Sequence, residues 1–405
     1  MSSPSRQADA SPQAHKLIGR LKLVGAAMGL LGIVGAVIGA LVDYKAFIET
    51  YLFAFVFWLA LPLGGLFLLM VHHLVRGRWG AILRRPLEAA ALTAPLFLLL
   101  FVPIALSPQS LYPWSIPEIV QASEVLRHKD LYLNVPFFLV RAAAFLGIWT
   151  LLAFVLRRWS LAQENTKNPG AYREYRTKLR ILSALGLVAL VLTDSFAMID
   201  WVQSLEPEWY SSIYPMMTIV GQLLTAMTFF CLLVLGLRKT DALSEFVDAD
   251  RLNDLGNLLL VFVVLWAYTE FVQLVIIWSG NTHHKIPWYL ARSAGGWAWV
   301  IAAVVALQFF VPLFALFFRK VKRSPKLFIG LCALIFVMRL ADVYWLVLPA
   351  FYDHEFVLLW QAFANWAAIG GLWLFAFAWL LGRKPLMTRS SKELFPEWRK
   401  AHGGR

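Results

Sequence analysis

Cysteine is nearly absent from this chain, which has only Cys231 and Cys332 among 405 residues. Both lie in apolar segments that we expect to be helices. Two thiols cannot supply the ligands of an iron–sulfur cluster or a framework of several disulfides. The sequence therefore excludes a chain that carries its own cluster or is held together by disulfide bridges.

Histidine is also scarce, with eight residues, and the two pairs that could suggest haem ligands are adjacent in sequence. His72 and His73 lie at the end of an apolar segment, and His283 and His284 lie in a loop. Neighbouring side chains on a helix point about 100° apart and cannot both reach one iron from the same face. We expect neither haem nor a metal site in the chain itself.

Charge is sparse at 15% of residues, whereas hydrophobic residues make up 60% and the mean hydropathy is +0.65. This composition excludes an ordinary soluble domain. Apolar runs of about 20 residues recur, each long enough to cross the hydrocarbon as a helix. We predict an all-α integral membrane protein, a single polytopic domain over residues 1–405, with ten transmembrane helices: Leu21–Leu41, Thr50–Leu74, Leu87–Leu106, Val135–Leu156, Leu179–Ile199, Met216–Leu237, Leu258–Trp278, Trp297–Phe318, Leu327–Leu348 and Val357–Leu381.

Basic residues are unevenly distributed between alternate connections. Most of the 37 Lys and Arg lie in the N-terminal segment, four alternate loops and the C-terminal segment. Because basic residues are retained in the cytoplasm during insertion, both termini, residues 1–20 and 383–405, are predicted to be cytoplasmic tails. The net charge of +13 is thus explained by topology, and no continuous basic stripe indicates nucleic-acid binding. The other alternate loops, on the opposite side of the membrane, contain only five basic residues: Lys45, Arg127, Lys129, Lys285 and Arg292.

A weak internal repeat relates the fifth and ninth predicted helices. Residues Lys178 to Asp194 and Lys326 to Asp342 align without a gap, sharing a Lys-Leu start, an isoleucine and a closing aspartate. Both helices run outward. We therefore predict two four-helix bundles in parallel repeat, helices 2 to 5 and helices 6 to 9, flanked by helices 1 and 10.

Small residues recur at spacings of three and four along one face of the first predicted helix. Such a face lets another backbone approach closely. It predicts either an internal helix contact or a docking face for another subunit. The residues are Gly25, Gly29, Gly32, Ala36 and Gly39.

Four prolines fall inside predicted spans. Neighbouring helices in a membrane can satisfy the backbone groups that proline frees. We therefore predict kinks rather than breaks at Pro62, Pro95, Pro103 and Pro312.

Ionisable residues inside the spans are the strongest indication of chemistry, because each costs roughly 3 kcal/mol at mid-depth on insertion scales. Arg141, Asp194, Glu270, Arg339 and Asp342 all fall in the predicted outer half of the membrane. Arg339 and Asp342 are three apart and can pair on one face. Asp194 has no basic partner on its own helix, so Arg141 on the preceding helix is its expected partner.

Glu270 has Tyr268 and Gln273 close by but no Lys or Arg within a helical turn. Desolvation then favours its protonated form. A carboxyl held near neutrality can take up and release a proton, as a proton relay or quinol oxidation requires. The alternative is a protonated carboxyl that only donates an interhelical hydrogen bond.

Acidic and aromatic residues crowd into the loop after the fifth helix. Aromatic residues alone indicate a membrane interface. The acids beside them predict either a mouth that attracts protons or cations, or a contact surface for a basic partner. The acids are Asp194, Asp200, Glu206 and Glu208, and the neighbouring residues of the motif are Trp201, Ser204, Trp209 and Tyr210.

The segment from Asp194, DSFAMIDWVQSLEPEWYSSIYPM, resembles the membrane subunits of alternative complex III, a bacterial quinol oxidoreductase, and its second, shorter polytopic subunit best. The run WAYTEFVQLVIIWSGN, from Trp266, resembles a helix of that subunit. The resemblance is specific in Ser204 to Ser211 and looser elsewhere, although span number and chain length agree. His283, His284 and Lys285 depart from it, because related sequences often carry acids there.

This resemblance implies a subunit of the polysulfide-reductase-type membrane anchors, in the inner (cytoplasmic) membrane of a bacterial cell and without redox metal. It implies partners: a sibling polytopic quinol-binding subunit, an iron–sulfur protein subunit and c-type cytochrome subunits, which carry the clusters and haem c. Either quinol binds near Glu270, Asp194 and Tyr268, or the polar residues form a proton half-channel while the sibling binds quinol. We favour the half-channel, because no histidine lies in the outer half to bind a quinol oxygen.

Two other classes remain open from the sequence. A proton-coupled secondary transporter also places acids within its helices. However, no span has a Gly-Pro break at matched repeat positions. A purely structural membrane anchor is the third possibility.

Overall fold

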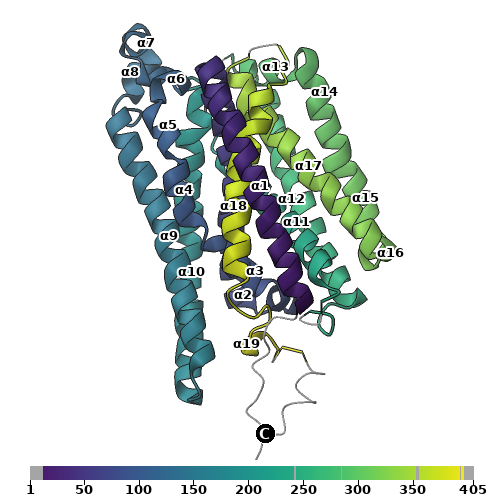
Figure 1. Cartoon of the computed structure of the whole chain (residues 1–405). Coiled ribbons are helices and arrows are strands. Elements are labelled where there is room, and N and C mark those ends of the chain that lie inside the picture. The colour runs from purple at the N-terminus through teal and green to yellow at the C-terminus, as the bar shows by residue number, and fades with distance from the viewer. Residues whose placement is uncertain (1–11, 241–242, 284, 353–354, 393, 396–405) are drawn as a thin grey trace, which may run out of the picture.

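The computed structural model describes residues 12–240, 243–283, 285–352, 355–392 and 394–395, except the side chains of residues 389 and 390. Within these residues every regular element is a helix, and ten helical segments are long and apolar enough to span a membrane (Figure 1). The chain is therefore a multi-pass membrane protein by length and composition. His284 and much of the two predicted tails lie outside the described residues.

The spanning segments follow the predicted order, although their bounds differ. The single-helix spans are α1 (Pro12–Val42), α2 (Tyr44–Val75), α9 (Val135–Asn165), α10 (Pro169–Trp201), α11 (Tyr214–Leu237), α12 (Ala249–Gly280), α17 (Pro325–Val347) and α18 (Trp360–Leu381). Two spans are composite: α3 (Arg78–Ala91), α4 (Ala94–Leu100) and α5 (Val102–Leu106) form the third, and α14 (Gly295–Val304), η3 (Val305–Phe310) and α15 (Val311–Phe317) form the eighth. The connections contain α6 (Pro108–Leu111), η1 (Pro113–Ser115), α7 (Pro117–Ala122), α8 (Glu124–Lys129), η2 (Gln203–Leu205), α13 (Ile286–Ser293), α16 (Arg319–Arg323), η4 (Leu348–Ala350) and α19 (Arg389–Lys392).

Polar caps fix where several long helices begin. Asp43 accepts a hydrogen bond from the backbone N of Ala46 at 3.1 Å and starts α2 immediately after α1. Asn134 accepts one from the backbone N of Phe137 at 3.0 Å and starts α9. Each cap satisfies an amide that the first helical turn leaves unpaired.

The expectation that proline does not break a span is confirmed at Pro62 and wrong at Pro95 and Pro103. Helix α2 runs through Pro62 without interruption. Pro95 and Pro103 instead lie in the first turns of α4 and α5, so the third span is a series of three helices. Proline is well tolerated in a first turn, where the missing N–H has no intrahelical partner. Pro312 follows the π-helical segment η3, where the hydrogen-bonding pattern already changes.

Helices α2 and α11 form the centre of the bundle. Their spanning windows are 94% and 78% buried, and the two helices contact each other. Helix α2 also contacts α3, α10 and α18, while α11 also contacts α12 and α17. The α9 and α10 pair lies on one side of this centre, and α14 to α17 lie on the other (Figure 1).

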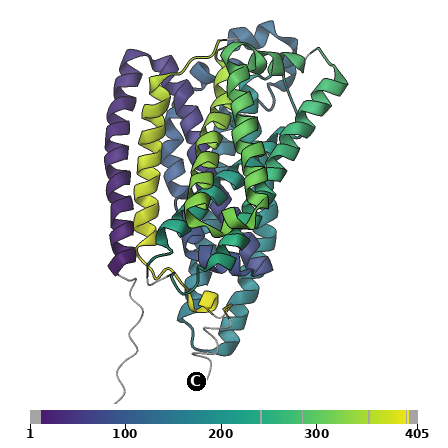
Figure 2. The same cartoon turned by 90° about the vertical axis from the view of Figure 1, so that its right-hand side faces the viewer.

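Helix α1 packs along α18, and the pair stands at the edge of the bundle (Figure 2). A Cβ atom on Gly32 would lie 2.1 Å from the backbone N of Ala368, and one on Gly25 would lie 2.6 Å from that of Phe375. Only glycine permits this approach. The small-residue face of α1 is thus an internal helix contact, which leaves little of it for another subunit.

The start of α1 and the end of α18 lie at one end of the bundle, which we call the terminal side (Figure 1). The short helices α7, α8 and α13 lie at the opposite end, which we call the far side. Because the first span begins and the last span ends on the same side, the arrangement agrees with an even number of spans. It places the outer-loop motif on the far side.

Candidate functional site

Buried polar side chains cross the centre of the bundle in its far half. We call this set the central polar strip, and it comes from five different spans. Its members are Asp194 on α10, Gln222 and Thr225 on α11, Glu270 on α12, Gln308 in η3, and Arg339 and Asp342 on α17.

Asp194 marks one end of the strip. Its side chain is 2% exposed, and its Oδ1 accepts a hydrogen bond from Nε2 of Gln222 at 3.2 Å. No Lys, Arg or His among the described residues forms an ion pair with it. Asp194 therefore lies in a low-polarity environment with a neutral amide as its hydrogen-bond donor.

Arg339 lies at the middle of the strip, and its guanidinium contacts side chains of α11 and of its own helix α17. Its Nε donates to Oγ1 of Thr225 at 3.1 Å, and its Nη1 pairs with Asp342 as the sequence spacing predicted. A Cβ on Gly221 would lie 2.4 Å from Nη2 of Arg339, so that glycine makes room for the charge. Asp342 also accepts from Nε2 of Gln308 at 3.3 Å. The buried arginine is thus paired and held from several sides, as a charge in hydrocarbon requires.

Glu270 lies at the other end of the strip. It interacts electrostatically with Arg339, although no basic residue is near it in sequence. Tyr214 and Tyr289 also lie within electrostatic range of Glu270, and both are near Arg292. Glu270 therefore lies between Arg339 and the tyrosines of α11 and α13 near the far side.

Two small cavities flank Gln222. One, of about 20 Å³, is lined by residues that include Tyr214, Gln222 and Arg339. The other, of about 10 Å³, is lined by residues that include Gln222 and Asp194. Volumes of this size are close to what a single water molecule needs, and because most lining residues are apolar, a water there would depend on the few polar side chains at each cavity. Gln222 thus stands between two water-sized spaces, one beside the buried arginine and one beside the buried aspartate.

The expected partnership of Arg141 and Asp194 is wrong. Arg141 donates from Nε to Oδ2 of Asp200 at 2.7 Å and from Nη2 to Oδ1 at 3.1 Å. Residues six apart on an ideal helix are rotated by about 240°, so Asp194 and Asp200 point in different directions from α10. Asp200 faces α9, and Asp194 faces α11.

The outer-loop motif mainly holds the far side together. The Trp114 indole N–H donates to Oγ of Ser204 at 3.0 Å, and Trp209 stacks on Trp288 with ring centroids 4.6 Å apart. Trp201 is fully buried. Tryptophan and serine side chains in this motif therefore pack against neighbouring segments, and Ser204 and Trp209 also line an open cavity of about 330 Å³.

Two of the four acids of the expected far-side mouth are paired with arginines, and a third is buried. Glu206 accepts from Arg292 at 2.6 Å, Asp200 is paired with Arg141, and Asp194 is buried. Only Glu208 among the four is exposed. The expectation of a four-acid surface mouth is therefore wrong, because two of the acids serve as ion-pair partners.

Three further predicted residues lie away from the strip. Tyr268 is 62% exposed on the outside of α12, and Tyr210 is 58% exposed beside Lys285, whose Nζ lies 4.3 Å from the ring centroid. Gln273 is fully buried, and its Oε1 accepts from Ser211 at 2.5 Å. Gln273 thus links the outer-loop motif to α12 by a hydrogen bond, and Tyr268 points away from the bundle.

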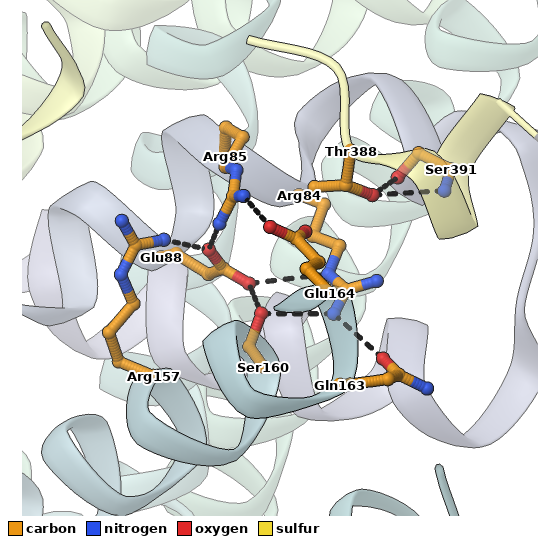
Figure 3. Close-up of polar contacts among 9 residues, drawn as sticks. All are labelled: Arg84, Arg85, Glu88, Arg157, Ser160, Gln163, Glu164, Thr388 and Ser391. Carbon is orange, nitrogen blue, oxygen red and sulfur yellow. Dashed lines mark hydrogen bonds and ion pairs between the residues drawn. The ribbon is translucent and has the colours of Figure 1, made fainter. Parts of the chain in front are cut away.

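The sequence argument overlooked Gln222, Thr225 and Gln308, because it considered only ionisable side chains. An amide inside an apolar helix is the signal that could have found Gln222 and Gln308. It also overlooked a second buried network near the terminal side, centred on Glu88 (Figure 3). Arg84 and Arg85 of this network precede the predicted start of the third span, whereas they lie within α3.

Glu88 accepts from three arginines and a serine in this second network: Arg84, Arg85, Arg157 and Ser160.

Among the described residues, no group of three His, Cys, Asp or Glu side chains could hold a metal ion. Comparison with protein-family models and with curated proteins finds no match for this chain.

Proposed function

We propose that this chain is a membrane subunit of a respiratory or photosynthetic quinol:electron-acceptor oxidoreductase of the alternative complex III type. Its own task is to conduct protons through the central polar strip. The sequence of the outer-loop motif supports the family assignment. The observation that carries the protonic role is the polar series from Glu270 through Arg339 and Gln222 to Asp194.

A proton path needs groups that change protonation at low cost, joined by waters or hydrogen bonds. Asp342 and Asp200 are each paired with an arginine, so a change in their protonation would break an ion pair, and they suit that task poorly. Asp194 contacts a neutral amide, so its carboxyl can be neutral or charged without breaking an ion pair. The two water-sized cavities beside Gln222 supply places for bridging waters.

Cavity size favours the half-channel over a quinol site within the central polar strip. Spaces of about 10 and 20 Å³ beside Asp194 and Arg339 are no larger than a single water molecule needs. A quinol ring needs far more room. Quinol oxidation is therefore assigned to the sibling polytopic subunit, and electron transfer to the iron–sulfur protein and c-type cytochrome subunits.

The helix contacts support the proposed duplication. Helix α2 packs on α3 and α10, and α11 packs on α12 and α17 in the corresponding way. One unit then comprises α2 to α5, α9 and α10, and the other α11, α12, α14, α15 and α17. Asp194 and Asp342 lie on equivalent helices. The terminal side is proposed to be cytoplasmic in the inner membrane of a bacterial cell, because Lys and Arg concentrate there.

A purely structural anchor is the second candidate, favoured by the ion pairs that satisfy Arg141 and Arg339. Both pairs would stabilise the bundle without moving protons. The unpaired carboxyl of Asp194 distinguishes the proposals, because a scaffold gains nothing from its titration. A proton-coupled transporter has less support, since the cavities of the strip are water-sized.

The assignment is tested by purifying the tagged full-length chain from its native membrane in a mild detergent. Co-purification with haem c, non-haem iron and quinol oxidation activity is the expected result. A chain that emerges alone, colourless and without iron from membranes that oxidise quinol would contradict the proposed complex. A tagged unrelated polytopic protein from the same membrane is the control for nonspecific capture.

A further inference from the structure

A cavity of about 180 Å³ opens between α3, α9 and the end of α18 near the terminal side. Its lining combines two kinds of residue. Leucines provide apolar walls, among them Leu161 and Leu380. The basic residues are Arg85, Arg157, Arg383 and Lys384.

The inner wall of this cavity is rigidly held. Arg85 is 4% exposed, donates to Glu88 at 2.7 Å and pairs with Glu164 (Figure 3). Arg157 pairs with Glu88 from the neighbouring helix α9. Among the described residues, Nε of Arg85 has no hydrogen-bond partner. The buried arginine therefore keeps an unused donor although its two Nη groups are engaged.

The rim of this cavity carries positive charge that no acidic side chain among the described residues balances. Arg383 and Lys384 are exposed and form no ion pair with any described residue. Arg383 lies over the ring of Trp379, 3.5 Å from its centroid, and Trp379 is itself 43% exposed. An interfacial tryptophan beside a basic residue marks the depth at which lipid head groups lie.

We propose that this cavity binds the phosphate-bearing head group of an anionic phospholipid, with the acyl chains along Leu161 and Leu380. Guanidinium groups bind phosphate oxygens through charge-assisted hydrogen bonds. Basic pockets between membrane helices are suited to anionic head groups. Because Arg85 and Arg157 already balance acids, Arg383 and Lys384 supply the net attraction. This inference does not depend on the proposed function.

Lipid binding to the full-length chain tests the proposal. Delipidated protein in detergent is titrated with phosphatidylglycerol, phosphatidylcholine or inorganic phosphate, and bound molecules are counted by native mass spectrometry. Phosphatidylglycerol should bind in preference to both other probes. The double variant Arg383→Gln, Lys384→Gln should weaken its binding about tenfold or more, because each basic residue near a membrane surface contributes appreciably to anionic-lipid binding.

The matched control is Arg319→Gln, Lys320→Gln, which removes two exposed charges from α16 outside the cavity. It should bind phosphatidylglycerol as the unmodified chain does. Equal binding of phosphatidylcholine, or unchanged phosphatidylglycerol binding in the Arg383 and Lys384 variant, would overturn the proposal. Inorganic phosphate that binds as tightly as the lipid would assign the cavity to a free anion, and would overturn it too.

Discussion

Arg141 on α9 and Asp200 on α10 form an ion pair through two hydrogen bonds, Nε to Oδ2 at 2.7 Å and Nη2 to Oδ1 at 3.1 Å. Asp194, six residues earlier on the same helix, faces α11 and contacts Gln222 instead. The two aspartates of α10 therefore have different roles. Asp200 joins α9 to α10 through its ion pair with Arg141, whereas Asp194 forms no ion pair with any described residue and is the acid that we propose to exchange a proton.

Replacing Arg141→Gln should destabilise the protein by about 3 to 5 kcal/mol, because it leaves Asp200 buried without its charged partner. Thermal unfolding in detergent measures the loss. The double variant Arg141→Gln, Asp200→Asn should recover part of it, since the orphaned charge is removed. If both variants have the melting temperature of the unmodified protein, the pair does not hold these helices together.

Replacing Gly221→Ala should displace the guanidinium of Arg339, because the new Cβ would lie 2.4 Å from Nη2. We expect a loss of about 1 to 3 kcal/mol from overpacking, measured by thermal unfolding. Gly330→Ala on α17 is the control, since a Cβ there meets nothing within 4 Å. Equal melting temperatures for the two variants would place Arg339 elsewhere.

Much of the fold follows from the sequence, because spans are set by runs of apolar residues. All ten segments were found in order. The third was placed too late, at Leu87, because Arg84, Arg85 and Glu88 depress local hydropathy. These charges neutralise one another inside the protein, so α3 starts at Arg78. Pairing across helices, invisible in a hydropathy profile, explains the difference.

Replacing Gly32→Ala should separate α1 from α18, because the added Cβ would lie 2.1 Å from the backbone N of Ala368. A loss of about 1 to 3 kcal/mol is expected from overpacking, together with faster proteolysis at the start of α1. Gly19→Ala on the same helix meets nothing within 4 Å and should leave both unchanged. Comparable behaviour of the two variants would refute the close contact.

Replacing Glu88→Gln should destabilise the terminal half of the bundle by about 3 to 5 kcal/mol, because it leaves buried arginines without their shared anion. The melting temperature and yield of folded protein measure the effect. Glu174→Gln provides the control, since Glu174 pairs with Lys178 on an exposed surface, where such a pair contributes little. Similar yields and melting temperatures for both variants would show that Glu88 does not stabilise the fold.

The candidate site was harder to predict from sequence than the fold. The spacing of Arg339 and Asp342 revealed their pairing, because both residues are on one helix. The direction of Asp194 depends on how α10 is rotated against α9 and α11, which its apolar neighbours do not specify. Glu270 has no Lys or Arg within a helical turn in the sequence, yet Arg339 of α17 lies within electrostatic range of it. Contacts between distant helices therefore limited the prediction.

The most direct test of the account is proton release during quinol oxidation by the purified complex in liposomes, compared between Asp194→Asn and Asp130→Asn. Asp130 is an exposed acid on the far side. The Asp130→Asn variant should therefore show the turnover and proton release of the unmodified protein. The Asp194→Asn variant should assemble with its haem and iron but lose proton-coupled turnover by about a hundredfold, the lower range for removing a positioned proton-transfer group. Unchanged turnover and proton release in assembled Asp194→Asn would contradict proton conduction through the central polar strip.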